Sequence, residues 1–192
     1  MFLDGDAFPI ADPMPLIAES LAKAPLMAVR RVENLNDQQP HPCFCVTTVG
    51  AWRDLPGDWS SGYEWVNSEG AHVSDVGANL LRQLELTKTP WVEVLRSNRK
   101  NLDPVFYGIY GDCVYHHGAG FRARQFTRAR HALEPVSRPL PRLPVRRQLV
   151  RRDNWKKQHA WKDETQEQGV LQSELVRERI EQGGNDWLAE FV

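Results

Sequence analysis

The chain opens with Met-Phe-Leu-Asp-Gly-Asp-Ala-Phe-Pro-Ile (residues 1–10), in which an apolar pair runs directly into two aspartates one residue apart. This pattern predicts a buried strand that ends in a turn. In open α/β sheets ligands bind just outside the carboxyl ends of strands, and carboxylate oxygens suit a divalent cation there. Asp-Gly is also a common turn dipeptide. The stretch therefore predicts either a metal site at Asp4 and Asp6 or a plain turn.

Short apolar segments follow this stretch, some with the alternation of a strand and some with the spacing of a helix. Strands are expected where β-branched residues or period-two alternation dominate, and a helix where apolar residues recur at helical spacing. Gly111-Asp112 is a turn between two strand-like runs and predicts a hairpin. The sequence thus predicts an α/β fold with a helix at 16–23, strands at 26–29, 41–49 and 91–95, and a hairpin at 105–117.

The strongest strand pattern is His41–Val49, which has no breaker after Pro42. Because side chains alternate along a strand, His41, Cys43 and Cys45 are expected on one face. That trio can be zinc ligands, but the paired Cys-x-x-Cys spacing of zinc fingers is absent. Cysteine is among the most commonly buried residues, so burial in the core is the favoured interpretation.

A helix is expected to start within Val73–Glu85, with an apolar stripe of leucines. Ser74 or Asp75 can cap its first turn. Asp75 has a second interpretation, as a carboxylate presented at the rim of a pocket.

The second strand of the hairpin ends in His116-His117-Gly118, and Arg122 follows a flexible turn. An imidazole at a strand end can bind a metal, and an arginine nearby can bind phosphate. Taken alone, this stretch is unremarkable.

Composition is that of an ordinary globular protein, with 41% hydrophobic and 26% charged residues. No apolar run approaches the roughly 18 residues that cross a bilayer, and the first residues carry acids where a signal peptide carries bases. Three cysteines do not suggest a disulfide framework. We expect a cytoplasmic protein without a transmembrane segment.

The net charge of −1 conceals a basic segment at residues 122–152, which holds ten arginines and one acid, a net of +9. Four prolines lie between Glu134 and Arg147, which favours an extended linker. The composition then becomes helical. These changes predict a core at 1–134, a Pro/Arg-rich linker at 135–152 and a helical tail at 153–192.

The order of three motifs resembles the metal-dependent GT-A glycosyltransferases, in particular small bacterial family-2-like transferases. The motifs are Phe2-Leu3-Asp4-Gly5-Asp6-Ala7, the acidic helix start Ser74–Leu81, and Tyr115-His116-His117-Gly118-Ala119-Gly120-Phe121-Arg122. The likeness spans about two thirds of the chain. It implies a three-layer, Rossmann-like GT-A core and transfer of a sugar from a nucleotide-diphosphate sugar to an acceptor hydroxyl on a glycan, lipid or protein.

The resemblance also implies a metal centre. Asp4 and Asp6 would bind Mn²⁺ or Mg²⁺ that bridges the donor diphosphate, with Asp6 the more direct ligand. His116 or His117 would complete the metal shell, and strand alternation points one of the two inward.

Two further roles come from the same resemblance. Arg122 would offset the charge that develops on the departing diphosphate. Asp75 would be the general base for the acceptor hydroxyl if the enzyme inverts the anomeric configuration.

The sequence departs from the family at its start, because the strands that hold the nucleotide in that fold precede the Asp-x-Asp strand. We therefore expect a GT-A core that is incomplete at its N-terminus, as in a fragment of a longer protein. If the chain is complete, we expect poor or no activity and an exposed sheet edge prone to association.

Two other functions compete with the transferase. Haloacid-dehalogenase-like phosphatases also open with a strand and Asp-x-Asp, the first Asp being the nucleophile and the second the general acid. Their pattern continues with Gly-Thr or Gly-Val, where Ala7-Phe8 stands here. A non-enzymatic protein would bind nucleic acid or another anion through residues 122–152. The proline content of that segment favours a linker, so nucleic acid is not the expected partner.

Overall fold

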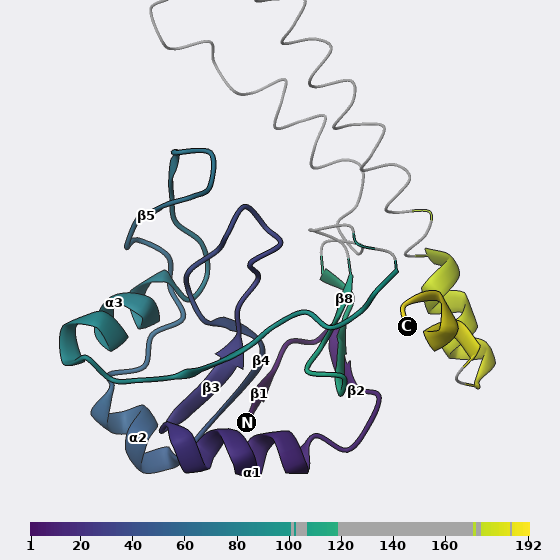
Figure 1. Ribbon diagram of the computed structural model, residues 1–192, viewed down its shortest axis with the longest axis horizontal. Coiled ribbons are helices and arrows are strands. Elements are labelled where there is room, and N and C mark those ends of the chain that lie inside the picture. The colour runs from purple at the N-terminus through teal and green to yellow at the C-terminus, as the bar shows by residue number, and fades with distance from the viewer. Residues whose placement is uncertain (101, 103–106, 119–170, 172–173, 185) are drawn as a thin grey trace, which may run out of the picture. The chain divides into compact units, whose positions relative to one another are not determined.

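The computed structural model describes residues 1–100, 102, 107–118, 171, 174–184 and 186–192 (Figure 1). The chain divides into two compact units, Met1–Gly118 with Gly184–Val192, and Ala119–Gly183. Arg122, the basic segment 122–152 and the predicted linker 135–152 lie outside the described residues. Of the predicted helical tail, residues 174–182 form a helix of the second unit. All elements below belong to the first unit.

The first unit is built on a four-stranded mixed sheet, which confirms the predicted α/β class. The strands lie in the order β1-β4-β3-β7. β3 pairs in parallel with β7, while β4 is antiparallel to both β1 and β3. Their bounds are β1 Phe2–Leu3, β3 Leu26–Val29, β4 His41–Thr47 and β7 Val92–Val94. Strand β4 ends at Thr47 because Thr48 caps the next helix, accepting a hydrogen bond from the amide of Ala51.

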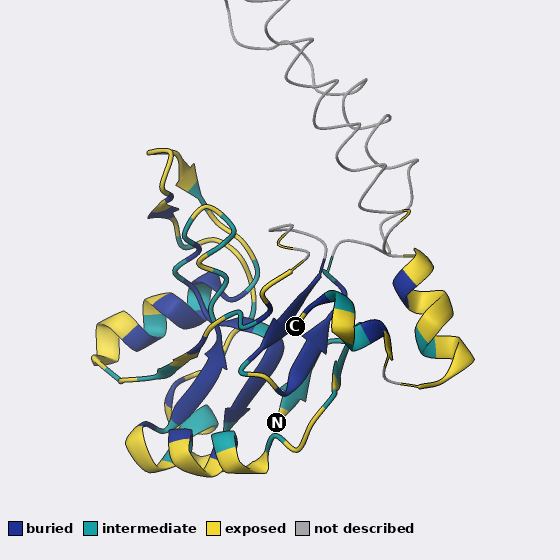
Figure 2. Cartoon of the chain, turned by 45° about the vertical axis from the view of Figure 1, so that its right-hand side comes forward, coloured by how far each residue is buried: buried dark blue, intermediate teal, exposed yellow. Residues whose placement is uncertain are grey.

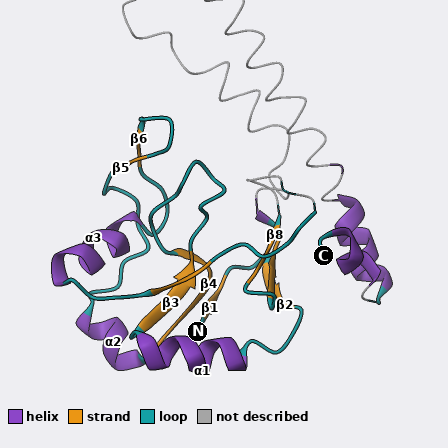
Figure 3. Ribbon diagram, viewed as in Figure 1, coloured by secondary structure: helices purple, strands orange, loops and turns teal. Residues whose placement is uncertain are grey.

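Side chains of β3 alternate between two core clusters, one on each face of the sheet. Leu26 and Ala28 pack with Leu80 and Leu84 of helix α3, whereas Met27 and Val29 pack with Ile17 of helix α1. All four residues of β3 are fully buried, and the outer sides of the helices are exposed (Figure 2). The sheet is therefore covered on both faces, as expected for hydrophobic strands without a polar side. The helices are α1 Met14–Lys23, α2 Val49–Asp54 and α3 Ala78–Thr87 (Figure 3).

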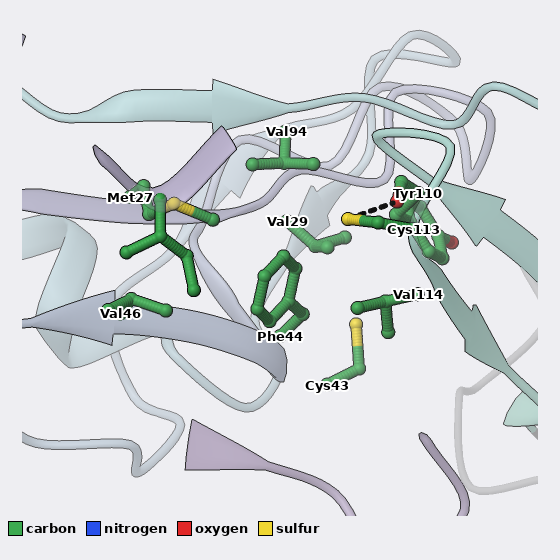
Figure 4. Close-up of a cluster of buried hydrophobic side chains, with 10 residues drawn as sticks. Met27, Val29, Cys43, Phe44, Val46, Val94, Tyr110, Cys113 and Val114 are labelled. Atoms are coloured by element: carbon green, nitrogen blue, oxygen red, sulfur yellow. Dashed lines mark hydrogen bonds between the residues drawn. The ribbon is translucent and has the colours of Figure 1, made fainter. Parts of the chain in front are cut away.

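An irregularity in the β3–β4 ladder, which leaves Pro42, Cys43 and Phe44 without partners on β3, changes the predicted faces of β4. Ala28 pairs with Cys45, but the next residue, Val29, pairs with His41. Proline has no amide hydrogen for the ladder, and bulges accommodate it. Cys45 packs with Leu26, whereas Cys43 packs in the other cluster (Figure 4). The prediction that His41, Cys43 and Cys45 share one face is thus wrong, and the described residues contain no such zinc trio.

A second, antiparallel sheet has the order β2-β9-β8 and contains the predicted hairpin. Its strands are β2 Ala7–Pro9, β8 Gly108–Tyr110 and β9 Val114–His116. Gly111 and Asp112 both have φ of +56° in the turn. The 3-10 helix η2, Asp186–Glu190, brings Trp187 and the following Phe191 onto the buried ring of Tyr115, with ring centroids 5.0 and 5.6 Å away.

Helix α3 begins later than predicted, and neither Ser74 nor Asp75 is its N-cap. The N-cap is Gly77, which has a left-handed φ of +86° and no side chain to offer. Its amide donates to the carbonyl of Trp59, and Ser74 instead accepts a hydrogen bond from the amide of Gly62. Short strands β5 Trp65–Val66 and β6 His72–Val73 precede this point. A tertiary contact, not a local capping residue, therefore sets the helix start.

Within the described part of the chain, no helix combines the length and the apolar character needed to span a membrane.

We predict that Gly77→Ala destabilises the protein more than Gly70→Ala. Both glycines have positive φ, +86° and +76°, so both variants carry backbone strain. A Cβ at position 77 would lie 2.0 Å from the carbonyl oxygen of Pro40, whereas nothing lies within 4 Å at position 70. We expect losses of about 1 kcal/mol for Gly70→Ala and at least about 3 kcal/mol for Gly77→Ala in urea unfolding. Equal losses would contradict the contact with Pro40.

Candidate metal centre

The turn after β1 joins the two sheets and carries the Asp-x-Asp pair. The amide of Ala7 donates to the carbonyl of Asp4 at 3.0 Å, which closes the turn and sends the chain into β2. β2 pairs with β9 so that Ala7 lies opposite His116, and the amide of His117 donates to the carbonyl of Asp6 at 2.9 Å. Backbone pairing thus brings the aspartates beside a strand more than a hundred residues away.

Three side chains converge at this junction. One carboxylate oxygen each from Asp4 and Asp6 and one ring nitrogen of His116 all lie within 4.8 Å of one another. His116 Nε2 is 3.5 Å from Asp6 Oδ1. Ligands on opposite sides of one ion lie roughly two metal–oxygen distances apart, about 4–5 Å. Two carboxylates and an imidazole suit Mn²⁺ or Mg²⁺ through the oxygens and a transition metal through the nitrogen, so the donor set fits a divalent cation.

The two carboxylates differ in their electrostatic surroundings. Burial raises the pKa of Asp4 above its ordinary value, against the opposing charges of His116 and Arg31. Burial also disfavours the charged form of Asp6, but the contact with His116 outweighs it and lowers the pKa of Asp6. Two partly buried carboxylates this close repel each other when both are ionised. A divalent cation would favour ionisation of both.

His117 lies on the opposite side of the strand from His116. Its Nδ1 is 2.9 Å from the hydroxyl of Tyr115, and its side chain is buried. Among the described residues the converging group contains His116 and not His117.

Asp75 does not belong to the group of three but is linked to its neighbourhood by Arg31. The guanidinium of Arg31 binds Asp37 at 2.8 Å and Asp75 at 2.9 Å. The side chain of Asp75 is 55% exposed, whereas that of Asp37 is buried. The charge of Arg31 also acts on Asp4. Arg31 therefore connects an exposed carboxylate at the surface with the buried edge of the candidate site.

His41 is a residue that sequence analysis missed as part of this site. It is 6% exposed, and its ring centroid lies 5.5 Å from that of His116. Burial lowers the pKa of His41 well below its ordinary value, and the charges of Arg31 and His116 act in the same direction. The available signal was Pro42, since a proline inside a strand marks a bulge, and bulges re-aim side chains next to functional sites.

Comparison with known proteins assigns no family to the chain. No protein-family model, curated protein or solved structure matches it. The group formed by Asp4, Asp6 and His116 is therefore the feature that points to a function.

We predict that the protein loses stability between pH 7.5 and pH 5.5 because of His41. The pKa of this histidine is lowered in the folded state, so below about pH 6.5 the unfolded chain binds a proton that the folded protein does not. The contribution of His41 to stability is then full above the unfolded pKa and is lost progressively as the pH drops through it. Urea unfolding at the two pH values measures it. His41→Asn should remove this part of the pH dependence, whereas the same substitution at the exposed His72 should not.

Proposed function

We propose that the protein is a metal-dependent glycosyltransferase that moves a sugar from a nucleotide-diphosphate sugar to an acceptor hydroxyl. The observation that carries the proposal is the convergence of Asp4, Asp6 and His116 at the end of a strand. The Asp-x-Asp order, the later histidine and the mixed α/β sheet with helices on both faces support a GT-A core as part of the proposal.

The ligand set assigns a task to each of the three residues. Asp4 and Asp6 supply carboxylate oxygens and His116 supplies a ring nitrogen to one Mn²⁺ or Mg²⁺ ion. When bound, that ion would act as a Lewis acid and offset negative charge on the diphosphate. The chain then needs no proton donor for the leaving group, because a nucleotide diphosphate leaves as an anion. The role of Arg122 toward the same charge stays a prediction, since it lies outside the described residues.

Asp75 is proposed as the general base. The acceptor oxygen forms a bond to the anomeric carbon as the bond from that carbon to the diphosphate breaks, and the hydroxyl proton passes to the carboxylate of Asp75. Exposure of this carboxylate leaves it accessible to an acceptor, and its ion pair with Arg31 holds it in one orientation. A single displacement of this kind would invert the anomeric configuration.

We predict that Mn²⁺ affinity depends on Asp6 and His116 but not on Asp112 or His117. Loss of a ligand should weaken Mn²⁺ binding at least about tenfold, as measured by calorimetry or electron paramagnetic resonance. Asp6→Asn and His116→Ala remove ligand atoms. Asp112→Asn changes an exposed acid on the β8–β9 turn, and His117→Ala changes the histidine that faces Tyr115. Equal weakening by His116→Ala and His117→Ala would contradict the assignment of His116.

We also predict that Asp75→Asn abolishes transfer while it leaves the metal site intact. Without a base, Mn²⁺-dependent sugar transfer from a panel of nucleotide-diphosphate sugars should fall at least about a hundredfold. Mn²⁺ affinity should not change, and Asp112→Asn should retain activity.

Two results would contradict the transferase proposal in different ways. Tight Mn²⁺ binding without turnover of any donor would leave a metal site but no glycosyl transfer. Full activity of Asp75→Asn would remove Asp75 as the base and leave its ion pair with Arg31 as its role.

A further inference from the structure

His41 has no task in the proposed function, although it is buried against the candidate metal centre. Its ring lies against that of His116, with 5.5 Å between the centroids, and the charge of Arg31 disfavours its protonated form. His41 lies at the end of the irregular part of the β3–β4 ladder, where it pairs with Val29. A buried polar side chain is normally satisfied by hydrogen bonds to protein or to water, so the partners of the two ring nitrogens of His41 decide its chemical role.

One of these nitrogens has a partner that defines the tautomer. The backbone amide of Cys43 donates a hydrogen bond to Nδ1 of His41 at 3.2 Å. A neutral imidazole has one acceptor nitrogen and one donor nitrogen. Since Nδ1 accepts, the proton of the neutral ring is on Nε2. Among the described residues Nε2 has no hydrogen-bond partner, and it is not one of the fully buried unpartnered atoms, so water or a ligand can reach it.

With this tautomer, His41 is suited to donate a hydrogen bond and not to bind a metal as His116 can. A metal ligand must present an unprotonated nitrogen, and the lone pair of His41 is already used by the amide of Cys43. To bind a metal through Nε2, His41 would have to move its proton to Nδ1, where it would face the amide hydrogen of Cys43. His41 therefore offers a hydrogen-bond donor on a ring that lies beside His116, whereas Nε2 of His116 lies 3.5 Å from Oδ1 of Asp6 as a candidate ligand atom.

The charges around Nε2 favour an anionic acceptor. A divalent cation would neutralise Asp4 and Asp6, and the guanidinium of Arg31 is held nearby by Asp37 and Asp75. A donor in partly dehydrated surroundings binds a charged oxygen more strongly than a neutral one. Phosphate oxygens on the cation are the acceptors that the proposed reaction brings to this position.

We propose that His41 donates Nε2–H to a phosphate oxygen of the diphosphate held at the cation and is not itself a metal ligand. This inference rests on the proposed function and adds to it a diphosphate-binding residue from β4. The inference also gives a role to the irregular part of β4, at whose end the ring of His41 lies beside that of His116.

A matched pair of variants tests the donor. His41→Asn retains an oxygen that can accept from the amide of Cys43 but is too short to offer an N–H at the position of Nε2. His41→Gln reaches that position with an amide N–H. The probe is inorganic pyrophosphate in the presence of saturating Mn²⁺, with binding measured by calorimetry.

We expect His41→Asn to weaken pyrophosphate binding by about ten- to a hundredfold, because a hydrogen bond to a charged group is lost. His41→Gln should recover at least part of that loss. Both variants should bind Mn²⁺ alone as the wild type does, and unchanged Mn²⁺ affinity also reports that the site is folded.

The possible failures are distinguishable. If His41→Asn binds pyrophosphate as tightly as the wild type, His41 is not a diphosphate donor, while the proposed function stands. If either variant loses Mn²⁺ affinity in a folded protein, His41 is a metal ligand and the assignment of its tautomer is overturned. If the wild type binds neither Mn²⁺ nor pyrophosphate with Mn²⁺, the proposed function itself fails and the inference fails with it.

Discussion

The antiparallel pairing of β2 with β9 is the constraint on which the candidate site depends. Asp4 and Asp6 lie in the turn between β1 and β2, so one sheet holds the beginning of that turn and the other sheet holds its end. The pairing of Ala7 with His116 then sets which side chain of β9 faces the aspartates. A slip of one residue would invert the faces of the strand and replace His116 with a neighbour.

Strand β4 contributes to the same junction from the other side. It pairs with both β1 and β3, and its ladder is interrupted at Pro42. The interruption brings Cys43 and Phe44 into one core cluster and turns His41 toward His116. The irregularity at Pro42–Phe44 thus affects both the packing of the core and the surroundings of His116. Fully regular alternation would have left His41 on the face occupied by Cys45.

Local patterns were sufficient to predict the strands around Leu26–Val29 and Val92–Val94 and the hairpin with its Gly-Asp turn. These segments have one dominant periodicity, and tertiary contacts did not alter it. Alternation could not decide between His116 and His117, because it places them on opposite faces of the strand but does not say which face meets the aspartates. That choice comes from pairing with β2, which is distant in sequence.

The helix start at Gly77 and the position of His41 were beyond prediction for a related reason. The amide of Gly77 donates to the carbonyl of Trp59, and the carbonyl of Pro40 leaves no room for a side chain at position 77; sequence spacing reveals neither contact. The convergence of the aspartates with His116 was expected through a family resemblance and not through spacing. The site is therefore the part of the molecule in which non-local pairing matters most.

The closing residues of the chain belong to the first unit, although the whole second unit lies between them and β9. Trp187 and Phe191 cover Tyr115, and the carbonyl of Phe191 accepts hydrogen bonds from the amides of Arg99 and Lys100. A nascent chain that has been synthesised only as far as Gly118 therefore lacks the aromatic cover of Tyr115. Contacts between residues this far apart in sequence form late in synthesis and carry a loop-closure entropy cost.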